Sequence, residues 1–212
     1  RTRQRGVMPR FVQCEYEERY ERMAKLKQID FIDTYSAGYR RQIFLTEGGF
    51  DTDYPDASVE DQELSFRLAE RGYKMVFNPR AIVYHRHPET LRAYFGRKFN
   101  IGYWKVRVLR RHPGKALRDS HTPQTLKAQL GLVLVLFVVL LLVPLRWAIW
   151  WAAVLITLLF LLSALPFTVR ALRKDLLIGL LSPCFLFLRA VALGLGMIKG
   201  SWDAAFRKEA MH

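Results

Sequence analysis

Two long apolar segments in the second half of the chain constrain its fold more than any other feature. Residues 126–145 include only two strongly polar side chains, and residues 147–169 carry no formal charge. About 20 apolar residues are enough for a helix that crosses the roughly 30 Å of hydrocarbon in a bilayer. Because only Arg146 separates the two segments, they predict an antiparallel hairpin of two membrane helices.

A third apolar segment, residues 176–198, is harder to place because it contains Pro183 and Arg189. An arginine at the bilayer centre costs at least about 2.5 kcal/mol on insertion scales. The segment therefore either crosses the membrane in contact with the other two or lies shallow in the interface. We expect a membrane region of two to three spans over residues 126–198, followed by a tail at residues 199–212.

Basic residues gather beside the open end of the predicted hairpin, as they do in loops on the cytoplasmic side of a membrane. They are Arg107, Arg110, Arg111, Lys115, Arg118 and Lys127 before the first span, and Arg170, Arg173 and Lys174 after the second. The hairpin turn has only Arg146, and tryptophans 147, 150 and 151 beside it are typical of a membrane interface. We expect an integral protein of the plasma (inner) membrane whose soluble part is cytoplasmic.

The overall composition averages two unlike halves. The chain of 212 residues has a formal net charge of +14, and 25 of its 33 Lys and Arg residues lie before position 129. Long apolar segments exclude a disordered tail, a collagen-like repeat and a small disulfide scaffold. Cys14 and Cys184 are far apart in sequence and predict neither a disulfide framework nor a metal cluster, which favours a reducing compartment. With no initiator Met and no leader at its start, the sequence is expected to begin inside a longer protein, as a C-terminal portion.

The part that precedes the membrane region has the pattern of a mixed α/β domain. Residues 15–27 predict a polar helix, whereas residues 74–77 and 81–85 predict short strands that Asn78-Pro79 interrupts. We therefore expect an α/β fold in residues 1–89, a basic amphipathic helix and linker in residues 90–125, and the membrane helices after them.

Ser58-Val59-Glu60-Asp61 has the pattern of a capping box at the start of another helix. Its buried face and its end are predicted from Leu64, Leu68 and Gly72. Glu60 and Asp61 then lie in the first turn, where the helix dipole favours ionised carboxylates. A fixed, ionised carboxylate can act as a general base on a hydroxyl group. The alternative is that both acids only stabilise the helix.

Four motifs in a fixed order carry a resemblance to a known family. They are Ser36-Ala37-Gly38-Tyr39-Arg40-Arg41, Glu47-Gly48-Gly49-Phe50-Asp51, Glu60-Asp61-Gln62-Glu63-Leu64, and Pro79-Arg80-Ala81-Ile82-Val83-Tyr84-His85. Over residues 33–113 the chain resembles the second half of a family 2 glycosyltransferase catalytic domain, which has the Rossmann-like GT-A fold. The membrane segments fit a membrane-bound branch of that family.

The resemblance implies a function and a set of site residues. It places the family's catalytic base on Asp61, beside Glu60, and implies an inverting transfer from a nucleotide-sugar donor to an acceptor hydroxyl. The acceptor is a polysaccharide, a glycolipid or a lipid-linked saccharide, as in cell-envelope polysaccharide biosynthesis. Gly48, Gly49 and Phe50 match the family's loop beside the acceptor, although the two glycines also suit a simple turn.

The resemblance also implies a divalent cation, Mg²⁺ or Mn²⁺, whose ligands we expect outside this sequence. Asp51-Thr52-Asp53 looks like an Asp-x-Asp cation motif, but the family's metal motif lies upstream of the region seen here, and Asp51 matches the acid that follows Gly-Gly-Phe. His85 is a weak candidate for holding a metal or a phosphate, and it fits a solvated turn with His87 equally well.

Residues 90–111 predict an amphipathic helix with aromatic and basic side chains, which suits the surface of an anionic membrane. Arg97 and Lys98 are candidates for binding the donor's diphosphate. The family's processive members have a Gln-x-x-Arg-Trp motif in this neighbourhood. This sequence lacks it, which argues against processive synthesis.

Two other classes of function remain to be weighed. The soluble part can be a degenerate transferase fold that serves as a non-catalytic membrane adaptor. Nucleic-acid binding is the weakest hypothesis, because the basic residues before the membrane segments are explained by lipid headgroups and topology. We therefore expect membrane lipids and no nucleic acid among the partners.

Overall fold

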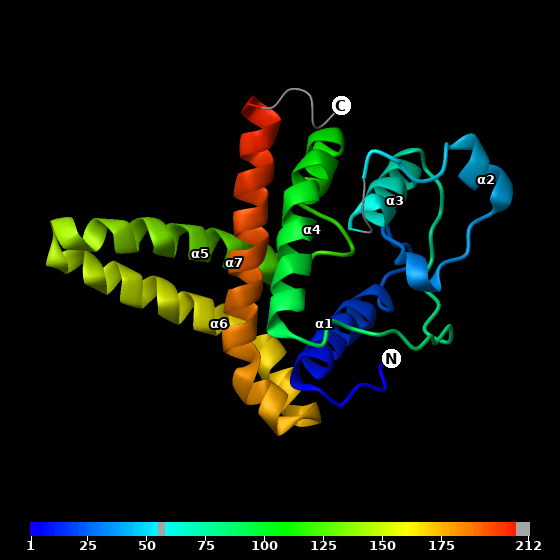
Figure 1. Cartoon of the computed structure of the whole chain (residues 1–212). Helices are drawn as coiled ribbons and strands as arrows, with labels where there is room; N and C mark the ends of the chain where they lie inside the picture. Colours follow the sequence, from blue (N-terminus) through cyan, green and yellow to red (C-terminus); the bar gives the residue numbers. More distant parts are fainter. Residues whose placement is uncertain (55–57, 207–212) are drawn as a thin grey trace.

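The regular secondary structure of the described residues is helical, and the helices form a polar group and an apolar group (Figure 1). This computed structural model describes residues 1–54 and 58–206. The α-helices are α1 (Val7–Met23), α2 (Arg41–Thr46), α3 (Glu60–Glu70), α4 (Leu91–Arg111), α5 (Gln124–Leu142), α6 (Trp150–Lys174) and α7 (Leu176–Phe206). Short 3-10 helices are η1 (Thr34–Ser36), η2 (Pro113–Ala116), η3 (Val143–Leu145) and η4 (Trp147–Ile149).

The expectation of an α/β fold with Rossmann-like strands is wrong for the described residues, which contain no strand. The segments at 74–77 and 81–85 are not in regular structure, and an isolated antiparallel bridge joins Ile29 to Met75. A strand needs a partner that continues the hydrogen-bond ladder over several residues. Here the pairing stops after that bridge, so an alternating apolar pattern alone forms no sheet.

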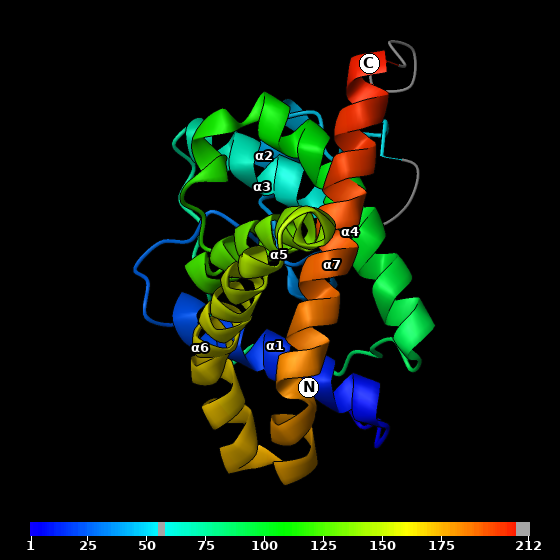
Figure 2. The ribbon, with the colours of Figure 1, turned by 90° about the vertical axis from the view of Figure 1, so that its left-hand side faces the viewer.

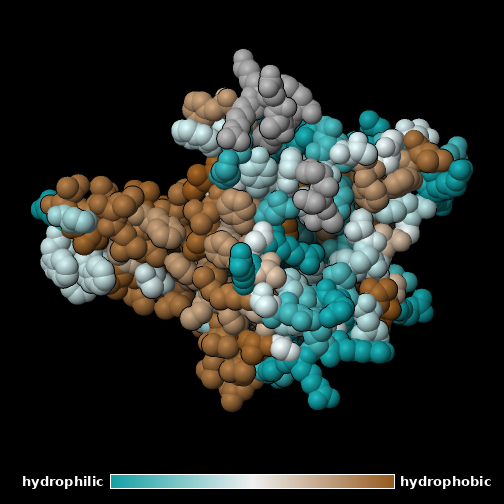
Figure 3. All heavy atoms as spheres, in the orientation of Figure 1, coloured by the Kyte–Doolittle hydropathy of each residue, from teal (hydrophilic) through white to brown (hydrophobic). Residues whose placement is uncertain are grey.

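Three helical segments are long and apolar enough to cross a membrane by length and composition: Gln124–Leu145, Trp147–Lys174 and Leu176–Phe206. The first two form a hairpin that projects away from the rest of the molecule (Figure 1), and its surface is largely apolar (Figure 3). Helix α7 extends past the predicted segment 176–198, so that residues 199–206 of the predicted tail are helical. Residues 207–212 of that tail lie outside the described part of the chain.

Helices α4 and α7 run side by side in both ribbon views (Figures 1 and 2). Glycines let the two backbones touch: a β-carbon built at Gly102 would lie 2.2 Å from the carbonyl oxygen of Leu193. A β-carbon at Gly196 would lie 2.1 Å from the carbonyl oxygen of Phe99. Any larger side chain at either glycine would push the helices apart.

Helix α1 begins earlier than residues 15–27 predicted, because its first turns are apolar and buried. Phe11 is fully buried, and its ring lies 5.8 Å from that of Tyr94, 5.6 Å from that of Phe167 and 4.9 Å from that of Phe185. This one side chain therefore joins α1 to α4, α6 and α7.

A buried polar cluster explains the arginine in the third apolar segment. Glu15 of α1 accepts hydrogen bonds from Arg189 of α7 at 3.0 Å, and from Lys98 and Tyr94 of α4 at 3.2 Å each. Arg189 also donates to the side chain of Gln129 in α5 at 2.9 Å. Burial opposes the ionisation of Glu15, but Lys98 and Arg189 hold its pKa below the usual value. Arg189 is thus charge-paired inside the protein and does not face lipid.

We predict that Glu15→Gln lowers the free energy of unfolding by about 3 kcal/mol, because it leaves two buried cations without their carboxylate. Chemical unfolding in detergent micelles would measure the loss. The matched control is Glu17→Gln on the same helix, whose partly exposed carboxylate lies 2.6 Å from Lys174. A surface pair of that kind contributes at most about 1 kcal/mol. Equal losses in the two variants would contradict a central role for Glu15.

Candidate active site

Asp61 lies in the first turn of α3, as the sequence predicted, but the predicted capping box between Ser58 and Asp61 is not formed. The side chain of Glu60 accepts a hydrogen bond from the backbone N–H of Ser58 at 2.7 Å. The hydroxyl of Ser58 caps nothing, because Val59 is the residue at the N-cap. Leu64 and Leu68 are buried as predicted, and the chain leaves the helix through Gly72, with φ of +81°.

The electrostatic surroundings of Asp61 make its carboxyl group a weak acid. Burial raises the pKa of Asp61 to about 7, and the neighbouring carboxylates of Asp33 and Glu60 add to the rise. A hydrogen bond from the backbone of Thr34 and the charge of Arg19 oppose it only in part. A carboxyl group with a pKa near neutrality is well matched to accept a proton at physiological pH.

Asp33, whose charge raises the pKa of Asp61, is held by residues of α1 that are not among the predicted site residues. One amino group of Arg19 donates to both carboxylate oxygens of Asp33, at 2.9 and 3.0 Å. The hydroxyl of Tyr20 donates to Asp33 at 3.1 Å. One feature of the sequence indicates Asp33 as a site residue: the family resemblance begins at this position, close to a helix with periodic aromatic residues.

Lys105 reaches the same region from α4. Its ammonium group donates to the side chain of Gln62, the neighbour of Asp61, at 2.7 Å. Burial lowers the pKa of Lys105 to about 8, against the opposing effect of carboxylates that include Asp61. Lys105 therefore points toward α3, whereas the sequence predicted that the basic side chains of this helix face lipid.

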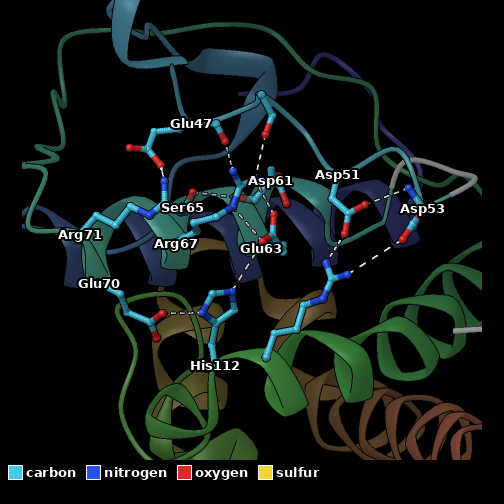
Figure 4. A network of polar contacts seen from close by, with 12 residues as sticks. Glu47, Asp51, Asp53, Asp61, Glu63, Ser65, Arg67, Glu70, Arg71 and His112 are labelled. Atoms are coloured by element: carbon cyan, nitrogen blue, oxygen red, sulfur yellow. Dashed lines mark hydrogen bonds and ion pairs between the residues drawn. The ribbon is translucent and has the colours of Figure 1, made fainter. Parts of the chain in front are cut away.

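The loop with Gly48 and Gly49 ends α2 and is held by α3. Both glycines have left-handed backbone conformations, with φ of +79° and +65°, which favour glycine. Arg67 of α3 points at this loop (Figure 4) and donates to the carbonyl oxygens of Glu47 and Gly49, the second at 2.8 Å. Glu63 holds the same guanidinium at 2.8 Å. The turn is thus built into the domain that carries Asp61.

Phe50 packs into an aromatic cluster beside this loop. Its ring centre lies 5.3 Å from that of Phe44 and 6.4 Å from that of Tyr39. Burial raises the pKa of Tyr39 to about 12, and the charge of Asp61 adds to this effect. Tyr39 therefore connects the ring of Phe50 to the neighbourhood of the candidate base.

Asp51 and Asp53 form ion pairs with arginines of α4. Asp51 pairs with Arg111, and Asp53 pairs with Arg107, which is buried. Arg107 thus faces the soluble domain and not lipid headgroups. Both acids are occupied by cations, and residues 1–54 and 58–206 contain no group of three or more His, Cys, Asp or Glu able to hold a metal ion. The described residues therefore do not fit the divalent cation that the resemblance implies.

His85, Arg97 and Lys98 are the remaining predicted site residues. His85 stacks on Tyr35, with ring centres 4.5 Å apart, and burial and the charge of Arg97 lower its pKa. Arg97 is exposed on α4, whereas Lys98 is engaged with Glu15. The two adjacent cations therefore have different surroundings, and only Arg97 presents its charge toward His85.

The comparisons with known proteins point to one family. A family model described as glycosyl transferase family group 2 matches residues 31–188. The O-antigen chain rhamnosyltransferase WbaN of Salmonella anatum is 35% identical over 74 residues. That stretch covers 34% of this chain and 22% of the relative, so the chain spans only about a fifth of the relative's length. No solved structure matches the chain.

We predict that Asp33→Asn lowers the pKa of Asp61 below 7, because it removes a nearby negative charge and leaves Arg19 free to attract the carboxylate, while the effect of burial remains. Carbon-13 NMR of labelled aspartate carboxyl groups in detergent would measure the titration, with Asp61→Asn assigning the signal. The matched control is Asp30→Asn, because Asp30 pairs with Lys115 at 2.7 Å and is not among the groups that shift Asp61. An unchanged Asp61 titration in Asp33→Asn would contradict the assigned coupling.

Proposed function

The chain belongs to glycosyl transferase family group 2, and we propose that it forms the acceptor-side part of an inverting, membrane-bound glycosyltransferase with Asp61 as its general base. The observation that carries the proposal is the place of Asp61 in the first turn of α3, where burial and the carboxylates of Asp33 and Glu60 raise its pKa to about 7. A structural helix-capping acid has no need of a facing carboxylate such as Asp33, which disfavours its ionised form. The pairing of the two acids suits proton transfer.

In the proposed reaction, the acceptor hydroxyl gives its proton to Asp61 while its oxygen attacks the anomeric carbon of the donor sugar. The bond from that carbon to the diphosphate breaks, and its electron pair leaves with the nucleoside diphosphate. Attack from the face opposite the leaving group inverts the anomeric configuration. Glu60 shapes the site by raising the pKa of Asp61 toward neutrality, which makes the ionised carboxylate of Asp61 a stronger base.

The other expected site residues take supporting roles in this proposal. The turn at Gly48 and Gly49, with Phe50, forms one wall for the acceptor, since Arg67 fixes it to the helix of Asp61. Of the two α4 cations, Arg97 is the better candidate for the donor's diphosphate, because its guanidinium is exposed while Lys98 is bound to Glu15.

We propose that the substrates are a nucleotide-activated sugar and a saccharide or lipid-linked saccharide of the cell envelope. The support is the relative's description as an O-antigen chain rhamnosyltransferase, which makes activated rhamnose the first donor to test. Such donors are cytoplasmic, so the proposal places the soluble part on the cytoplasmic side of the plasma (inner) membrane. The basic residues around Arg170 and Lys174, at the open end of the hairpin, support this orientation.

We predict that a cysteine at Arg80 reacts with an impermeant maleimide only in inside-out vesicles, whereas one at Arg146 reacts only in right-side-out vesicles. Both side chains are exposed, one in the soluble part and one in the hairpin turn. The positive-inside rule gives this direction. Labelling of the Arg80 position from the outside would remove the active site from the side of the nucleotide sugars.

We predict that Asp61→Asn lowers turnover of the complete protein by at least about 100-fold while its unfolding is unchanged, because the amide cannot accept the proton. In the wild type, turnover should fall as the pH drops through about 7, when Asp61 becomes protonated. Radiolabelled sugar transfer in membranes would measure both effects. Asp30→Asn is the control and should keep its activity. Normal turnover in Asp61→Asn would refute the assignment, and wild-type membranes that bind acceptor without transfer would favour an adaptor.

A further inference from the structure

Helix α7 is long and apolar enough to cross a membrane, yet it touches the polar helices along its whole length. Just before it begins, Asp175 accepts a hydrogen bond from Arg10 of α1 at 2.7 Å. In its middle, Arg189 is bound to Glu15 of α1. Near its end, the hydroxyl of Tyr103 in α4 donates to Asp203 at 3.0 Å.

These three contacts decide how α7 can lie in a bilayer. At a rise of 1.5 Å per residue, the stretch from position 175 to position 203 is about 42 Å long, which exceeds the roughly 30 Å of bilayer hydrocarbon. If α7 crossed the membrane, parts of α1 and α4 would have to cross with it. Helix α4 carries seven Lys and Arg residues, and the exposed side chains of Arg92, Arg97 and Arg110 exclude it from the hydrocarbon core.

The hairpin of α5 and α6 is placed differently. It projects to one side of α7 and lies crosswise to it in Figure 1, and it points toward the viewer in Figure 2 while α7 stands upright. A hairpin that crosses the bilayer along its own length therefore places α7 along the membrane plane. The soluble elements α2 and α3 then lie on the far side of α4 and α7 from the hairpin.

The outward face of α7 suits that position. It presents an apolar stripe with helical spacing, whose exposed members are Leu177, Leu180, Leu195, Ile198 and Trp202, each at least 45% exposed. The polar side chains Arg189 and Asp203 are buried on the opposite face. The apolar surface of the hairpin continues onto the region where α6 meets α7 (Figure 3). The hydrocarbon of one bilayer can therefore cover the hairpin and this part of α7.

We propose that α7 is an interfacial helix that lies beside α4 in the membrane surface, with its apolar stripe among the acyl chains of one leaflet. Only the α5–α6 hairpin crosses the bilayer, and the end of α7 is on the same side as the soluble domain. The α4–α7 pair holds the domain of Asp61 at a fixed height above the headgroups, where the sugar of a lipid-linked acceptor would be presented. The topology itself does not depend on the proposed activity.

Thiol accessibility distinguishes two crossings from three. In a background with Cys14→Ala and Cys184→Ala, single cysteines are placed at Ala205 near the end of α7, at Arg80 and at Arg146, all exposed positions. Sealed vesicles of each orientation are treated with an impermeant maleimide. The Ala205 position should react from the same side as Arg80. Reaction from the side of Arg146 would overturn the proposal, whatever the enzyme's activity.

A depth measurement tests the same proposal without labelling from either side. Spin labels at Leu177, Cys184 and Leu195 should show one common immersion depth in liposomes, by oxygen and nickel-chelate accessibility. A spanning helix would instead place the middle label about 10 Å deeper than the first. Labels at Leu155 and Leu165 of α6 are the matched control and should differ in depth. Unequal depths on α7, or spin–spin coupling that reveals a second copy on the stripe, would refute the proposal.

Discussion

The arrangement of the helices depends on the carboxylate of Glu15. It lies where α1, α4 and α7 meet, and it accepts hydrogen bonds from Lys98 and Arg189. In a low-dielectric interior, an arginine in an apolar helix requires an anionic or strongly polar partner, and a helix with such a residue is confined to positions where the partner can reach it. Glu15 therefore fixes α7 against the polar helices, and Gln129 extends the contact to the hairpin.

Helix α4 connects this junction to the candidate site. On one side it contacts α7 through Gly102 without space for larger side chains. On the other side, Arg107 pairs with Asp53, and Lys105 reaches Gln62 beside Asp61. A basic helix that was expected to face lipid thus uses several of its cations inside the protein. Helix α4 therefore contacts both α7 and the residues that surround Asp61.

The sequence predicted best what depends on local pattern. The apolar segments, the start of α3 near Glu60 and the turn at Gly72 follow from composition, helix periodicity and glycine's backbone freedom. The pattern could not show that the segments at 74–77 and 81–85 would lack strand partners, because pairing is a non-local property. It also could not show which α4 cations turn inward: Arg107 and Arg110 look alike in sequence, yet only Arg107 is buried. The environment of Asp61 could not be predicted for the same reason, since Asp33 and Arg19 come from other parts of the chain.

The carboxyl pair of Asp61 and Asp33 carries a cost in stability that bears on its role. A group whose pKa is higher in the folded than in the unfolded state favours folding while it is protonated, and that contribution is lost as the pH rises through the folded-state pKa. For Asp61 this contribution is lost progressively as the pH rises from about 4 to about 7, so that above about pH 7 its environment opposes folding. Arg19 relieves Asp33 of this repulsion by direct pairing, but no such cation bonds the side chain of Asp61 among the contacts of the described residues. The pKa of Asp61 thus stays raised, while the charge of Asp33 is neutralised by Arg19. A carboxyl group with a raised pKa suits proton transfer, whereas helix capping needs only an ionised carboxylate.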